Sequence, residues 1–113
     1  MKLQKLIDTL KLEVKAGKDR LNNEVTGGYA GDLLSDVMAN SQEGDIWITL
    51  HVHENIAAVA SLNDLAGILI INNRCPDENT IEKANQEGIP ILVSALPAFE
   101  LIGRLYDLGI RGA

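Results

Sequence analysis

The residues of this chain that could do chemistry stand in four short stretches. Thr26-Gly27-Gly28-Tyr29-Ala30-Gly31 gathers three glycines beside a threonine, and His51-Val52-His53 holds both histidines. The single cysteine, Cys75, follows Arg74, and Ser94 ends an apolar run. Glycine-rich turns bind phosphate, paired histidines bind metals, and cysteine or serine beside a base acts as a nucleophile. Each stretch therefore suggests a different chemistry.

The glycine-rich stretch predicts a turn followed by a helix. Paired glycines adopt backbone angles that side chains forbid, or let another backbone come close. A turn before a helix leaves free N–H groups that can hold an anion. The stretch matches neither G-x-x-x-x-G-K-S/T nor G-x-G-x-x-G, and a carboxylate at Asp32, in the first helical turn, would repel a polyphosphate. Close packing is therefore the favoured interpretation, with phosphate binding as the alternative.

The histidines and the cysteine have simpler alternatives as well. His51 and His53 would share one face of a strand and could bind one metal ion, but no cluster of further ligands stands near them in the sequence. We expect no metal and no cofactor, and the alternative role of His53 is to hydrogen-bond loop backbone before the next helix. Cys75 beside Arg74 would suit a nucleophilic thiolate, yet the sequence places no oriented base, so a structural thiol is favoured.

Composition limits the class of protein. The chain has 113 residues, 46% hydrophobic and 23% charged, which is the balance of one globular domain with its own core. A formal net charge of −6 without a basic run argues against nucleic-acid binding. No apolar run reaches the length of a membrane span, and the charged start is unlike a signal peptide. A single cysteine fits a reducing compartment, so we expect a cytoplasmic protein.

Strand patterns alternate with helical ones along the chain. Apolar residues at helical spacing predict a first helix from Leu3 to Leu10, and later helices begin near Leu33, near Ile56, at Asp77 and at Pro97. Strands are expected at 12–14, 45–50, 67–71 and 89–93, with an extended segment at Val25. Short connections favour parallel pairing. The sequence therefore predicts a three-layer α/β fold, a mostly parallel sheet of about four to five strands with helices on both faces.

Loops that follow parallel strands emerge at one edge of the sheet, where α/β proteins bind ligands. We expect loops 26–31, 51–55, 72–77 and 94–97 to meet at this carboxyl edge. Thr26 and Ser94 suit hydrogen bonding to a small ligand better than catalysis. The predicted ligand-binding or interface residues are Thr26, Gly27, Gly28, Tyr29, His53, Asn55, Arg74 and Ser94.

The last helix has two apolar faces, although a helix packed on a sheet needs one. Phe99, Ile102 and Tyr106 form one face, and Leu101, Leu105 and Leu108 form the other. We expect the surplus face, assigned to Leu101, Leu105 and Leu108, to contact a second copy in a homodimer, with Gly103 permitting close approach. The alternative is scattered surface apolar residues.

Three blocks of the sequence together resemble a known family. Val25-Thr26-Gly27-Gly28-Tyr29-Ala30-Gly31-Asp32-Leu33-Leu34-Ser35-Asp36-Val37-Met38-Ala39-Asn40 resembles the signature of the DRTGG domain. His53-Glu54-Asn55-Ile56-Ala57-Ala58-Val59-Ala60 and Glu87-Gly88-Ile89-Pro90-Ile91 resemble later blocks of that family. The likeness spans about residues 10 to 110, in the order the family would have. One departure is that Glu24 and Val25 stand where the family name has Asp-Arg.

The resemblance implies a single α/β module over 1–113, similar to the N-terminal domain of HPr kinase/phosphorylase and without a catalytic P-loop domain. Related domains accompany CBS domains in some pyrophosphatases and the front of some phosphotransacetylases, as regulatory and subunit-contact elements. The implied function is a stand-alone, non-catalytic regulatory or interaction module that is homodimeric and takes a small ligand or a protein partner. The alternative is a small enzyme, or a fragment of one, using His53, Cys75 and Arg74 at the carboxyl edge.

Overall fold

The computed structural model describes residues 1–112 of the chain. Five strands and five α-helices alternate through most of this length, with one short 3₁₀ helix, η1, at Lys18–Arg20. The strands are β1 (Glu13–Ala16), β2 (Gly27–Ala30), β3 (Asp45–Thr49), β4 (Gly67–Ile70) and β5 (Ile91–Val93). The helices are α1 (Leu3–Leu10), α2 (Leu34–Asn40), α3 (Asn55–Leu62), α4 (Glu78–Glu87) and α5 (Ala98–Asp107).

All five strands form one sheet in the order β1-β5-β4-β3-β2. Strands β2 to β5 are parallel to their neighbours, and β1 pairs antiparallel with β5 at one edge. Each parallel connection passes through a helix, because parallel strands cannot be joined by a tight turn. The predicted α/β class and the mostly parallel sheet are confirmed.

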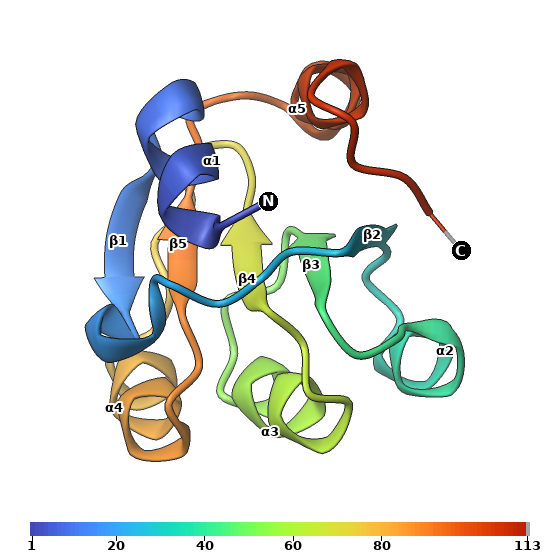
Figure 1. Cartoon of the computed structure of the whole chain (residues 1–113). Helices are drawn as coiled ribbons and strands as arrows, with labels where there is room; N and C mark the ends of the chain where they lie inside the picture. The colour runs from blue at the N-terminus through green and yellow to red at the C-terminus, as the bar shows by residue number, and fades with distance from the viewer. Residues whose placement is uncertain (113) are drawn as a thin grey trace.

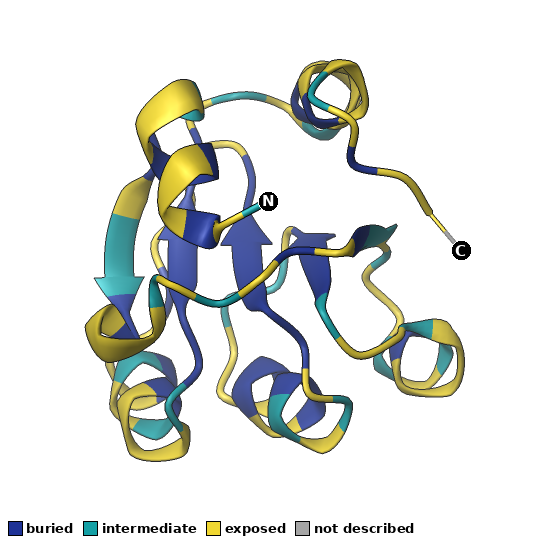
Figure 2. Cartoon of the chain, viewed as in Figure 1, coloured by how far each residue is buried: buried dark blue, intermediate teal, exposed yellow. Residues whose placement is uncertain are grey.

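Helices cover both faces of the sheet, as Figure 1 shows: α1 and α5 lie over one face, and α2, α3 and α4 lie over the other. Side chains of the central strands alternate between these layers, as the pleat requires. Ile46, Ile48, Leu69 and Leu92 join the core under α1 and α5, whereas Trp47, Ile68, Ile70, Ile91 and Val93 join the core above α2, α3 and α4. Figure 2 shows the three middle strands buried and the outer helical surfaces exposed.

The glycine-rich stretch differs from its prediction. Gly27–Ala30 is strand β2 rather than a turn, and it pairs residue for residue with β3 from Gly27 opposite Asp45 to Ala30 opposite Ile48. The turn toward α2 falls later, at 31–33. Thr26 and the first two glycines therefore lie toward the amino edge of the sheet. Among the residues described, no helix is long and apolar enough to cross a membrane.

Candidate functional site

The carboxyl edge is formed by the loops that follow β2 to β5, and hydrogen bonds join each loop to the next. Asp32 joins the first two: its Oδ1 accepts from the Thr49 hydroxyl at 2.8 Å and from the Leu50 N–H at 2.9 Å. The imidazole Nε2 of His51 donates to the Asp32 carbonyl. Asp32 thus precedes α2 and serves as an acceptor for a buried hydroxyl, which corrects its predicted place in the first turn of that helix.

The second junction holds the two loops that carry the candidate catalytic side chains. The Val52 carbonyl accepts from the Asp77 N–H at 3.0 Å and from the Thr80 hydroxyl at 2.6 Å. This contact brings the loop of His53 beside the loop of Arg74 and Cys75. The predicted meeting of these loops at one edge is therefore observed.

Ser94 holds the third junction and is itself a structural residue. It is 3% exposed, its Oγ accepts the Leu96 N–H at 3.1 Å, and its carbonyl accepts the Asn73 N–H at 2.7 Å. Asn72 and Asn73 adopt left-handed backbone angles with φ of 57° and 55°, and both are exposed. Ser94 lies at the predicted edge, but its hydroxyl is buried and engaged, so the neighbouring asparagines present the polar surface there.

His53, Asn55 and Arg74 are the predicted residues that the edge exposes. The Nδ1 of His53 accepts the Asn55 N–H at 3.4 Å, which is the alternative role considered for this histidine at the start of α3. Cys75 is exposed, and its Sγ donates to the Pro76 carbonyl at 3.5 Å. An imidazole, an amide and a guanidinium on neighbouring loops can bind an anionic or polar ligand by hydrogen bonds.

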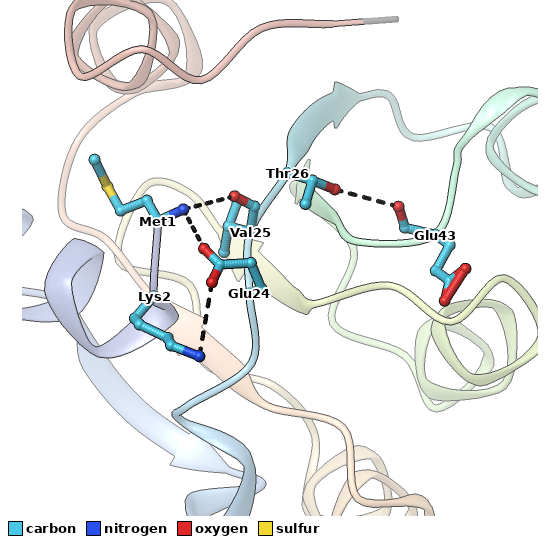
Figure 3. Close-up of polar contacts among 6 residues, drawn as sticks. All are labelled: Met1, Lys2, Glu24, Val25, Thr26 and Glu43. Atoms are coloured by element: carbon cyan, nitrogen blue, oxygen red, sulfur yellow. Dashed lines mark hydrogen bonds and ion pairs between the residues drawn. The ribbon is translucent and has the colours of Figure 1, made fainter.

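Thr26 lies at the opposite edge of the sheet, so its predicted position beside His53 is wrong. Its N–H donates to the Gly44 carbonyl at 3.0 Å. Its hydroxyl donates to the Glu43 carbonyl at 3.4 Å (Figure 3). The Glu24 carboxylate forms ion pairs with the Met1 amine and with the Lys2 ammonium, the second at an N···O distance of 3.6 Å. Both contacts are drawn in Figure 3. These contacts fasten the start of the chain to the segment that leads into β2.

The glycine pair of β2 is explained by close packing. A Cβ on Gly27 would lie 2.7 Å from Asp45 Oδ1 and 3.1 Å from the Arg111 carbonyl oxygen, and one on Gly28 would lie 3.2 Å from a methyl of Ile110. The Gly28 N–H donates to the Arg111 carbonyl at 3.1 Å. The segment after α5 therefore lies along the outer edge of β2, where side chains on these glycines would push it away. This was the favoured interpretation from the sequence.

Tyr29, the last predicted residue of this stretch, points its hydroxyl toward α2. The hydroxyl donates to Asp36 Oδ2, and this hydrogen bond is the main reason why the pKa of Tyr29 is raised above its ordinary value, with partial burial adding to it. The ring also packs at the margin of the core between the sheet and α2, α3 and α4. Tyr29 thus fixes α2 to the edge strand.

Helix α5 packs on the sheet through the face that was predicted to be exposed. Leu101 and Leu105 are 0% and 2% exposed against the sheet, and Leu108 is half-buried. These two fully buried leucines are therefore unavailable as dimer contacts. The other predicted face is the surplus one: Phe99 is 91% exposed, Ile102 36% and Tyr106 56%.

Two hollows adjoin this exposed face. A small one of about 220 Å³ lies between β2 and α5, bounded by Gly28, Ala30, Ile48, Ile102, Leu105 and Tyr106 together with residues 110–112. A broader one of about 630 Å³ runs along α5 from Phe99 to Asp107. The guanidinium of Arg111 lies 3.7 Å from the centre of the Tyr106 ring, which makes a cation–π contact at the rim. The sequence identified Phe99, Ile102 and Tyr106 as one apolar face of this helix, but it predicted neither that this face is the exposed one nor the hollows beside it.

The histidines, cysteine and carboxylates of the described residues form no cluster suited to a metal ion. Within residues 1–112, no three such side chains are close enough to hold a metal ion together.

A depression of about 520 Å³ lies at the amino edge of the sheet. The residues around it include Arg20 and four acidic residues, Glu24, Glu43, Asp64 and Glu87.

Comparison with known proteins gives a likeness of fold. No family model and no curated protein matches the chain. A solved structure similar to it is that of the CBS and DRTGG domains of the regulatory region of Clostridium perfringens pyrophosphatase, complexed with the activator diadenosine tetraphosphate. The TM-score is 0.72 at 18% sequence identity, over 90% of this chain.

The chain spans 44% of that structure, less than half of its length. At this identity the likeness is one of fold. Together with the sequence blocks around residues 25–40, 53–60 and 87–91, it supports the resemblance to the DRTGG domain. This chain therefore has the fold of a DRTGG-like domain.

Proposed function

We propose that this chain is a non-catalytic regulatory module that forms a homodimer and binds a small ligand, a nucleotide or a phosphorylated metabolite. The observation that carries the proposal is the likeness of its fold to a pyrophosphatase regulatory region that is complexed with an activating nucleotide. The single cysteine favours a reducing cytosol as its compartment.

The ligand site that we propose is the exposed part of the carboxyl edge, formed by His53, Asn55 and Arg74. Arg74 would bind phosphate oxygens through its fixed fork of donors, and the other two side chains would orient the ligand. The hydrogen-bonded loops support this role, because ordered loops lose little entropy when a ligand binds.

Calorimetric titration with diadenosine tetraphosphate and with ATP tests this site. Arg74→Ala should weaken binding by about tenfold or more, the amount expected for a charge-assisted hydrogen bond. Lys18→Ala is the matched control, because Lys18 is an exposed cation near the other edge of the sheet and should leave the affinity unchanged. If neither probe binds the folded protein, the nucleotide proposal fails. If binding is insensitive to both Arg74→Ala and His53→Ala, the site lies elsewhere.

The competing function is a small enzyme with His53, Arg74 and Cys75 at the same edge, which the contact between their loops favours. Cys75→Ala separates the two functions, because a regulatory site should keep its affinity for ligand without the thiol. ATP incubated with the wild-type protein should release no more phosphate than a blank, since no P-loop lysine is present. Phosphate release that Arg74→Ala abolishes would establish the enzyme instead.

The homodimer in this proposal depends on the exposed apolar face of α5 rather than on its leucines. Phe99, Ile102 and Tyr106 form a contiguous apolar patch on one helix, and such patches commonly mark contact surfaces. Light scattering should give twice the 12.2 kDa chain mass. A monomer at high concentration would contradict this part of the proposal and leave the ligand site untouched.

A further inference from the structure

We propose that two copies of this chain pair through antiparallel α5 helices, and that Phe99 of each copy fills the hollow between β2 and α5 of the other. The inference rests on the homodimer proposed above and names its contact. It assigns a binding site to Phe99, which is the most exposed large apolar side chain of the described residues.

The hollow exists because β2 presents small residues to α5. Gly28 has no side chain, and its missing Cβ would point toward Ile110 and Ile46 on the α5 side; Ala30 bounds the same space with a single methyl. The remaining walls are mostly apolar. A dry apolar cavity of about 150 Å³ suffices to bind benzene, so about 220 Å³ can accept the ring of a phenylalanine.

The exposed face of α5 allows a second helix to approach. Gly103 lies between Phe99 and Tyr106, and a Cβ built on it would meet nothing within 4 Å. The broad hollow of about 630 Å³ runs along this face. A glycine at the centre of a helix face lets the axes come closer than larger side chains permit, so the flanking aromatic rings can reach the partner.

Symmetry supplies the geometry. Phe99 and Tyr106 are seven residues apart, about two helical turns or roughly 10 Å, and they lie on one face. A twofold axis near Gly103 in an antiparallel pair places Phe99 of one copy against Tyr106 of the other. Because Tyr106 and Ile102 bound the small hollow, each Phe99 then stands at its mouth. A twofold contact closes on itself, so the pair would be a dimer and not a chain.

Charge also favours this surface. The residues from 98 to 112 carry two acids, Glu100 and Asp107, and two arginines, Arg104 and Arg111, so this segment is neutral whereas the chain carries −6. A contact through this segment therefore adds no local excess of like charge between two copies. A few aromatic side chains of about 150–250 Å² each give an interface at the small end of the known range, which predicts a reversible dimer.

Sedimentation equilibrium of Phe99→Ala tests the contact. Removing a central aromatic anchor should weaken dimerisation by about thirtyfold or more. Leu62→Ala is the matched control, because Leu62 is 70% exposed on α3, over the other face of the sheet, and should leave the dimer intact. Ala30→Leu, which fills the hollow from β2 and leaves the sequence of α5 unchanged, should weaken dimerisation as well.

Cross-linking tests the orientation. In a Cys75→Ser background, a mixture of Phe99→Cys and Tyr106→Cys chains should form a disulfide-linked heterodimer faster than a mixture of Phe99→Cys and Leu62→Cys chains. If the wild-type protein is a dimer and both the Phe99→Ala and the Ala30→Leu variants dimerise as tightly, this contact is overturned while the homodimer stands. A wild-type protein that stays monomeric would refute the homodimer itself.

Discussion

Gly27 and Gly28 lack side chains, and this lets neighbouring groups pack closely against β2. Gly27 is buried between the Asp45 carboxylate and the Arg111 carbonyl, and Gly28 gives its N–H to the same carbonyl. The residues after α5 thereby satisfy the Gly28 N–H, one of the backbone groups that edge strands otherwise present to other chains. Both glycines have the extended backbone of an ordinary strand, which any residue can adopt. Glycine is needed here because it has no side chain, and not because of its backbone freedom.

Gly27→Ala should therefore destabilise the protein by about 1–3 kcal/mol, the usual cost of overpacking, because its Cβ would lie 2.7 Å from Asp45 Oδ1. Chemical denaturation measures the loss. Gly31→Ala is the control: its Cβ would meet neighbours at 3.6 Å or more, so stability should change little. Equal stabilities of the two variants would show that Gly27 is not tightly packed against Asp45 and Arg111.

Tyr29 gives a prediction at alkaline pH. Its pKa is raised by the hydrogen bond to Asp36, so the stability it contributes is present below the ordinary tyrosine pKa of about 10 and is lost as the pH rises through its folded value. Asp36→Ala should bring the pKa of Tyr29 back down. The chain has two tyrosines, so tyrosinate absorbance is titrated in a Tyr106→Phe background. An unchanged Tyr29 titration in the Asp36→Ala variant would contradict this assignment.

At the scale of elements, the two faces of α5 differ in what they stabilise. Leu101 is fully buried, so Leu101→Ala should lower the free energy of unfolding by about 2–5 kcal/mol. Phe99→Ala, measured at a concentration where the protein is monomeric, should stay within about 0.5 kcal/mol of wild type, because Phe99 is 91% exposed. The reverse order of these two losses would mean that α5 packs on the sheet through Phe99.

The sequence predicted the regular elements well where periodicity was strong. The apolar runs at 45–50 and 67–71 fall on β3 and β4, and Gly88, with φ of 69°, ends α4 as expected. The faces of α5 could not be told apart, since both are apolar and only packing decides which one meets the sheet. Residues 27–30 suggested a turn because glycine favours turns, whereas pairing with β3 and with Arg111 makes them a strand.

For the candidate site, the sequence predicted which loops lie at the carboxyl edge but not the side-chain contacts within them. Topology brings every loop after a parallel strand to one edge, so His53, Asn55, Arg74 and Ser94 were placed there correctly. Thr26 was misplaced because the strand begins one residue after it. Burial of the Ser94 hydroxyl and the acceptor role of Asp32 depend on side-chain contacts between loops far apart in sequence, which periodicity does not encode.

The whole molecule sets the conditions under which two copies can meet. Each chain carries −6, with a pI of about 4.7, and the charge outside residues 98–112 accounts for all of it. Long-range repulsion thus opposes association while the apolar face of α5 favours it. Apolar packing through α5 acts only at contact, whereas repulsion between the net charges acts over a longer distance. Salt distinguishes the two effects, because it screens the repulsion and leaves the apolar packing in place.

The proposed dimer should therefore strengthen as ionic strength rises from about 0.02 to 0.5 M, since the Debye length shrinks well below the size of the molecule. Sedimentation equilibrium at several salt concentrations measures the trend. A Phe99→Asp variant should stay monomeric throughout, which separates screening of net charge from a general salting-out effect. If association weakens with salt, ion pairs between the copies hold them together, and the apolar contact through α5 is not the main source of affinity.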